Sequence, residues 1–108
     1  MLAKTHDAIA PEFLVGAWFS TTGWAKEHAD AIRRFRAVIV ETARWANVHH
    51  DESAKILEKY THLATPPGMR RVPFAEKAEA AAIQPVIDAA AKYGVLKSAF
   101  PATELLLP

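Results

Sequence analysis

The segment from Phe13 to Phe19 constrains the fold of this chain more than any other part of it. The run contains no polar side chain; Pro11 precedes it and Ser20 follows it. A continuous run of aromatic and branched residues predicts a strand, over about residues 12–20, that is buried on both faces. Such a strand needs neighbours, because its backbone donors and acceptors are otherwise unpaired. No comparable second strand follows in the sequence, so something else must pair this one.

The residues after this run have helical periodicity. We expect a first helix over about residues 23–48, either continuous or broken near His28 to Asp30, a second over about 51–64 and a third over about 77–93. Asp51 is suited to cap the second helix. The first helix carries one apolar stripe, formed by Ile32, Phe35, Ile39, Ala43 and Ala46.

Two residues in the last part of the chain affect the third helix. Pro85 lies inside it and predicts either a kink or a helix that restarts with this proline in its first turn. Gly94 is suited to end it, with Val95 and Leu96 available for apolar contact. The predicted fold class is mainly α, with one apolar β-strand followed by three to four helices in a single unit of residues 1–108.

Charge and composition exclude several functions. The 13 Lys and Arg residues nearly balance the 12 Asp and Glu residues, so no nucleic-acid partner is expected. The absence of cysteine excludes thiol catalysis, disulfides and zinc–thiolate sites. Residues 1–7 lack the apolar region of a secretory signal, and the longest apolar run is too short to span a membrane. As written, the chain is predicted to be soluble and cytoplasmic.

The pair His49-His50, followed by Asp51 and Glu52, has the residue types of a zinc or nickel site. Adjacent residues do not share a helix face, and no other histidine lies four residues from this pair. We therefore predict a polar junction between helices and no metal site.

Other clusters favour structural roles. Arg33, Arg34, Arg36 and Arg44 share their helix with acidic residues, which is typical of a solvated face, and surface pairing accounts for Arg70-Arg71. Aromatic rings that could line a pocket are more often part of a core; these are Phe13, Trp18, Phe19, Trp24, Phe35 and Trp45. Cap or turn positions account for Ser20, Thr21 and Thr22. We predict no catalytic residues, no cofactor and no enzyme activity.

Five blocks of the sequence occur in the order found in one known family. They are residues 7–19 (DAIAPEFLVGAWF), 31–35 (AIRRF), 54–61 (AKILEKYT), 71–75 (RVPFA) and 82–94 (AIQPVIDAAAKYG). The chain resembles the C-terminal portion of the ABC-transporter substrate-binding proteins for nitrate, sulfonate and taurine, with their thiamine-precursor relatives. The last block is the most specific and is similar to the family's last helix, including its internal proline. One departure is His28-Ala29, where the family has an Asn-Pro-like break, so the flanking helices could be fused here.

The resemblance implies a two-lobed α/β periplasmic binding protein of type II, of which this chain covers about the last third. Such a receptor closes on a small anion or organic solute and delivers it to an ABC permease. The segment Phe13–Phe19 would return to the first lobe, so its partner would be the remainder of the receptor or another copy of this chain. The family's ligand contacts lie mostly outside this portion, so no ligand-binding residue is carried over. The alternative is a stand-alone helical module for self-assembly or interaction, with Phe13–Phe19 helical in a bundle if it is not a strand.

Overall fold

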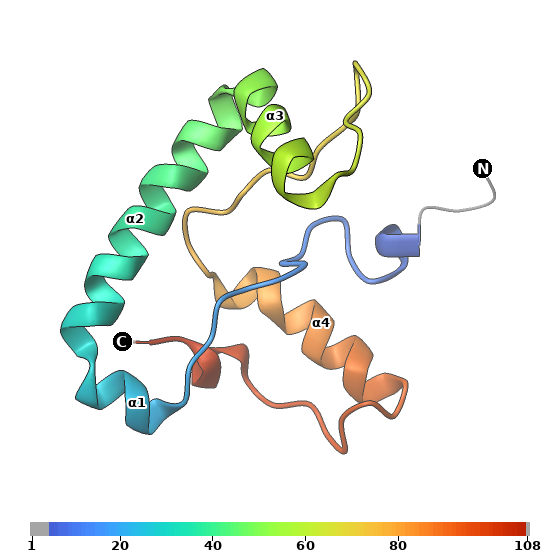
Figure 1. Ribbon diagram of the computed structural model, residues 1–108. Helices are drawn as coiled ribbons and strands as arrows, with labels where there is room; N and C mark the ends of the chain where they lie inside the picture. The colour runs from blue at the N-terminus through green and yellow to red at the C-terminus, as the bar shows by residue number, and fades with distance from the viewer. Residues whose placement is uncertain (1–4, 108) are drawn as a thin grey trace. The chain divides into compact units, whose positions relative to one another are not determined.

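The computed structural model describes residues 5–107 (Figure 1). Its regular elements are 3-10 helix η1 (Thr5–Ala8), α1 (Thr22–Glu27), α2 (Ala29–Val48), α3 (His50–Thr61), α4 (Ala80–Lys92) and 3-10 helix η2 (Ala102–Leu105). No strand occurs in the described residues. The prediction of a mainly helical chain is confirmed. Two compact units make up the chain: residues 20–76 form one, and residues 1–19 with 77–108 form the other.

The prediction of a strand over residues 12–20 is wrong, because this stretch has no regular secondary structure. The run from Phe13 to Phe19 is joined to α4 by a backbone hydrogen bond from the Leu14 N–H to the Ala82 carbonyl at 2.8 Å, and it forms no ladder within residues 5–107. A strand exists only as part of a ladder, and the described residues offer no neighbouring strand. Burial on both faces is also absent, since Val15 is 63% exposed and Phe19 98%.

The first predicted helix, residues 23–48, is found as α1 and α2 with a break at His28. A break near this position was one of the two alternatives, and fusion of the flanking helices is excluded. Thr21 caps α1, since its hydroxyl accepts a hydrogen bond from the Trp24 N–H at 3.3 Å. The centre of the predicted stripe on α2 is confirmed: Ala43 is buried, and Ile39 beside it is half-buried.

The second predicted helix, residues 51–64, is α3 and spans His50–Thr61. Asp51 does not cap it, because His49 occupies the N-cap position and Asp51 lies in the first turn. The helix ends earlier than predicted because His62 adopts the left-handed backbone conformation, with φ 58°. Figure 1 shows the chain turning from the end of α2 directly into α3. His49 is the one residue between these two helices.

The third predicted helix, residues 77–93, is α4 and begins three residues later, because Glu79 is still extended. Pro85 lies inside this helix, beyond its first turn, so a restart at the proline is wrong. The role of Gly94 is confirmed. Its φ is 77°, its N–H donates to the Ala91 carbonyl, and the Val95 N–H donates to the Ala90 carbonyl. These two bonds form a Schellman motif, which satisfies carbonyls at the end of a helix.

A side-chain amide holds η2 against α4. Gln84 Oε1 accepts a hydrogen bond from the Ala102 N–H at 2.8 Å, and its Nε2 donates to the Phe100 carbonyl at 3.1 Å. Each of the two elements also has a buried apolar residue, Ile87 in α4 and Ala102 in η2. Residues 100–102 are therefore fixed on α4 by one amide that bonds both a donor and an acceptor of their backbone.

The core of the described residues is small. Its buried apolar residues are Ala25, Ala43, Ile87 and Ala102, so three of the four contribute only a methyl group. Large side chains such as Phe19 remain exposed. None of the described helices combines the length and the hydrophobicity that a bilayer crossing requires. Residues 1–4, part of the stretch predicted to lack a secretory signal, lie outside the described residues.

Candidate functional site

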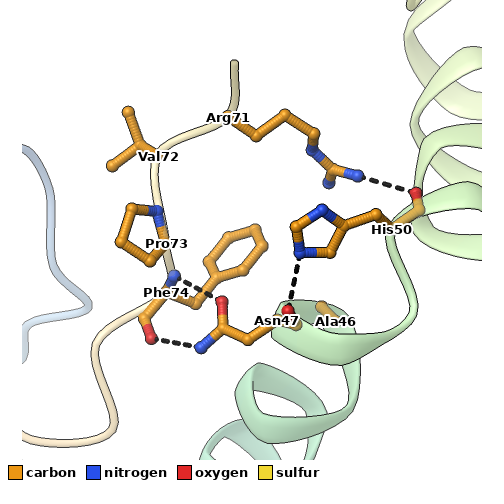
Figure 2. A pocket seen from close by; sticks show the side chains of 7 residues that line it. All are labelled: Ala46, Asn47, His50, Arg71, Val72, Pro73 and Phe74. Atoms are coloured by element: carbon orange, nitrogen blue, oxygen red, sulfur yellow. Dashed lines mark hydrogen bonds between the residues drawn. The ribbon is translucent and has the colours of Figure 1, made fainter. Parts of the chain in front are cut away.

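A hollow of about 330 Å³ lies beside the junction of α2 and α3, within the unit of residues 20–76 (Figure 2). Helix residues form one side of it, and an extended segment forms the other. The lining residues are Ala46, Asn47, His50, Arg71, Val72, Pro73 and Phe74. From the sequence, His50 and Arg71 had been considered as polar candidates, Ala46 as part of the apolar stripe, and residues 71–75 as one of the family blocks.

Asn47, near the end of α2, bonds the backbone of the extended segment through both the nitrogen and the oxygen of its side-chain amide. Its Nδ2 donates to the Phe74 carbonyl at 2.8 Å, and its Oδ1 accepts from the Phe74 N–H at 2.8 Å. This pattern imitates the paired bonds that a residue in a neighbouring antiparallel strand would make. Two such bonds stabilise the attachment by about 2 kcal/mol in net terms.

Arg71 attaches the same segment to α3. One of its terminal nitrogens donates to the His50 carbonyl at 3.0 Å and to the Ser53 hydroxyl at 2.7 Å. Ser53 is only 7% exposed, and its hydroxyl in turn donates to the His50 carbonyl. Surface ion pairing, predicted for Arg70-Arg71, therefore does not describe these contacts of Arg71, whose acceptors are neutral groups of the first turn of α3.

The helix breaks on either side of α2 share one local arrangement. The ring of His28 stacks on Trp24 with centroids 4.5 Å apart, and the ring of His49 stacks on Trp45 at 4.9 Å. Each histidine also bonds the carbonyl of its tryptophan through Nδ1, at 3.1 and 2.9 Å. Since a carbonyl only accepts, Nδ1 carries the proton in both rings.

Sequence reasoning missed this arrangement, although a signal was present. Trp24 and His28, like Trp45 and His49, are four residues apart, the spacing that places two side chains on one face of a helix. Both tryptophans had been interpreted as core residues, and they are instead partly exposed.

The cluster His49-His50-Asp51-Glu52 is a junction between helices, as predicted. His49 bonds Trp45, and His50 Nε2 lies 2.6 Å from the Asn47 carbonyl, so both rings bind the backbone of α2. No group of three or more His, Cys, Asp or Glu side chains in residues 5–107 is placed to hold a metal ion.

Several charged side chains of α2 lie in solvent-exposed pairs, which is typical of the predicted solvated face. Arg33 and Arg34 both pair with Asp30, and Arg44 pairs with Glu76 at 2.7 Å. Each side chain in these pairs is more than one-third exposed, so each contributes little to stability.

The polar side chains that line the hollow make hydrogen bonds to other parts of the chain. Asn47 and Arg71 each make two hydrogen bonds to the protein, and His50 makes one. A catalytic pair would need a nucleophile and a base within hydrogen-bond reach, and the lining residues include no Ser, Thr, Cys, Lys, Asp or Glu. The arrangement therefore joins segments of the chain.

Another joining contact lies at the end of α3. Thr65 donates to the carboxylate of Glu58 through its hydroxyl and through its backbone N–H, the latter at 2.8 Å. The hydroxyl bond, followed by the backbone bond, lowers the pKa of Glu58 below its ordinary value.

Comparisons with known proteins give no assignment. No known protein family matches the chain, and neither a curated protein nor a solved structure is significantly similar to it.

Proposed function

We propose that this chain is the C-terminal part of the solute-binding component of an ABC importer of the nitrate, sulfonate and taurine type. The order of the five sequence blocks supports the proposal, and the comparisons contribute no support. In the proposed receptor the chain belongs to a periplasmic, two-lobed α/β protein, and the segment Phe13–Phe19 joins a sheet made with the remainder of that protein. The ligand is a small anion or organic solute, and the membrane partner is an ABC permease.

One observation carries the proposal: an apolar segment without regular structure has large side chains in solvent. Val15 is 63% exposed and Phe19 98%. Covering a side chain such as Phe19 would stabilise the protein by about 1.5–3 kcal/mol, and pairing the backbone would satisfy donors and acceptors now left to water. The missing part of a receptor would supply both, whereas in the structure Phe13 and Leu14 are only half-buried and the rest of the run is exposed.

The proposed role is binding and transport, without catalysis. Helices α2 and α4 would cover the outside of a lobe, and the ligand would bind only in the complete receptor. In the proposed complete receptor, which has the type II binding-protein fold, Phe13–Phe19 is a strand.

A first test is the coding sequence upstream of the Met1 codon. An in-frame stretch that encodes an export signal and the strands of both lobes is expected, and its absence would contradict the proposal. That stretch also provides the partner for a binding experiment, in which the upstream part is produced with an affinity tag and this chain is produced without one.

Two valines allow a matched binding experiment. We expect the wild-type chain to be retained by the tagged upstream part and Val15→Asp to be lost, since a charge would then enter an apolar interface. Val95→Asp is the control, because Val95 is 79% exposed and lies in the same unit but outside the segment. Equal retention of both variants would contradict a role for Phe13–Phe19 in the contact.

The same exposed segment also favours the second candidate, a stand-alone module that assembles with copies of itself. Sizing chromatography over a range of concentrations separates the two candidates. Under the second, the chain alone forms a defined oligomer, and Val15→Asp but not Val95→Asp converts it to a monomer. Under the first, the defined complex requires the upstream part.

A further inference from the structure

Residues 71–76, here called the strap, run past the corner between α2 and α3 and are fastened on the α2 side. Asn47 bonds both backbone groups of Phe74, and Arg44 pairs with Glu76 at 2.7 Å. Both contacts come from the second half of α2, so the strap follows this helix toward its end.

The strap is fastened on the α3 side as well. Arg71 donates to the His50 carbonyl (Figure 2). It also donates to the Ser53 hydroxyl, and both acceptors lie in the first turn of α3. Ser53 is buried, which makes this attachment less accessible to competing water than the ion pair at Glu76. The two ends of the strap therefore bind different helices.

The residue between these attachments is His49, the single non-helical residue separating α2 from α3. Its φ and ψ are −112° and 64°, and it serves as C-cap of α2 and N-cap of α3. Stacking on Trp45 fixes the His49 ring to α2. Because this stack lies wholly on the α2 side, it does not set the direction of α3.

From this arrangement we infer that the strap locks a hinge at His49. The hinge is the backbone of His49, and the lock is the set of hydrogen bonds made by Asn47 and Arg71. The lock fixes the angle between α2 and α3. The lock thereby fixes the direction in which α3 presents its exposed apolar side chains, Ile56 and Tyr60. The inference concerns the unit of residues 20–76 alone and is independent of the proposed function.

The absence of native cysteine allows a direct test. Exposed Arg36 on α2 and exposed Lys55 on α3 are replaced by cysteine and spin-labelled, and the distance between the labels is measured by pulsed electron resonance. The otherwise native chain is expected to give one narrow distance distribution. Adding Asn47→Ala and Arg71→Ala should broaden it toward longer distances, up to the separation of about 28 Å that one straight helix sets between these backbone positions.

Arg70→Ala is the matched control for Arg71→Ala, because Arg70 is the exposed neighbour in the same segment. It should leave the distribution unchanged. Circular dichroism of every variant reports whether the helices persist. An unchanged distribution in the variant that lacks both fasteners would overturn the inference. Loss of the helical signal would overturn it equally, since the strap would then support the helices themselves and not the angle between them.

Discussion

Two helices of this chain end on residues with a left-handed backbone. α4 is followed by Gly94 with φ 77°, and α3 ends at His62 with φ 58°. A side chain on a left-handed residue costs about 1–2 kcal/mol, whereas glycine adopts this conformation freely. No heavy atom lies within 4 Å of the position that a Cβ on Gly94 would occupy. The effect of a substitution there is therefore conformational and not steric.

Opposite substitutions at these two residues should have opposite effects. Gly94→Ala should weaken the end of α4 by about 1 kcal/mol, and His62→Gly should strengthen the end of α3 by a similar amount. The measurement is hydrogen exchange, of the Val95 and Leu96 amides for α4 and of the His62 amide for α3. A change of about fivefold in protection corresponds to this free energy. Faster exchange at His62 in His62→Gly would contradict the account.

Single residues also show which features of the fold could be predicted from the sequence and which could not. Gly94 was recognised because glycine after an apolar helix has one common use, and its predicted role is confirmed. His62 was not recognised, because only a few per cent of non-glycine residues adopt a positive φ and nothing in the neighbouring residues marks the position. The role of Asn47 was not recognised, because its two bonds to Phe74 join residues 27 positions apart and no local sequence pattern indicates such a contact.

At the scale of elements, apolar periodicity predicted the helices well and the extended segments poorly. α2, α3 and α4 were predicted with ends that differ by a few residues, because helix ends depend on single residues such as His49 and Glu79. The strand over residues 12–20 failed for a different reason. The apolar composition of residues 12–20 indicates that the segment would be stabilised by an apolar neighbour. Whether a neighbouring strand is present depends on the rest of the fold.

The contact between α3 and the loop after it predicts a pH dependence. The bonds from Thr65 lower the pKa of Glu58 from its ordinary value of 4.5 in the folded chain. A group whose folded pKa is lowered contributes stability above its unfolded pKa and loses that contribution as the pH falls through the folded value. Attachment of the loop, followed by the NMR signal of the Thr65 amide, should therefore weaken on acidification below about pH 4.5.

Two variants isolate this contact. Glu58→Gln should abolish the pH dependence of the Thr65 signal, and Thr65→Val should raise the pKa of Glu58 part of the way toward 4.5, because the backbone bond remains. If Glu58→Gln retained the wild-type pH dependence, another group would be responsible and the assignment would be wrong.

At the scale of the whole molecule, the described residues bury little and leave much apolar surface in solvent. The buried apolar side chains are three alanines and Ile87, while Val15 and Phe19 are exposed. Hydrophobic burial is the dominant favourable term in folding, so a chain with this distribution gains stability by acquiring a partner. The sequence predicted this need from the unpaired segment alone, although it predicted the wrong local structure there.

The most direct test of the central claim, that the chain cannot cover Phe13–Phe19 by itself, is hydrogen exchange of the amides of Val15, Gly16, Ala17 and Phe19. In a dilute monomeric solution of the chain, these amides should exchange at the rate of an unstructured peptide. They should become protected when the upstream part of the proposed receptor is added. Strong protection of the same amides in the dilute monomer would show that the chain covers the segment unaided and would contradict the account.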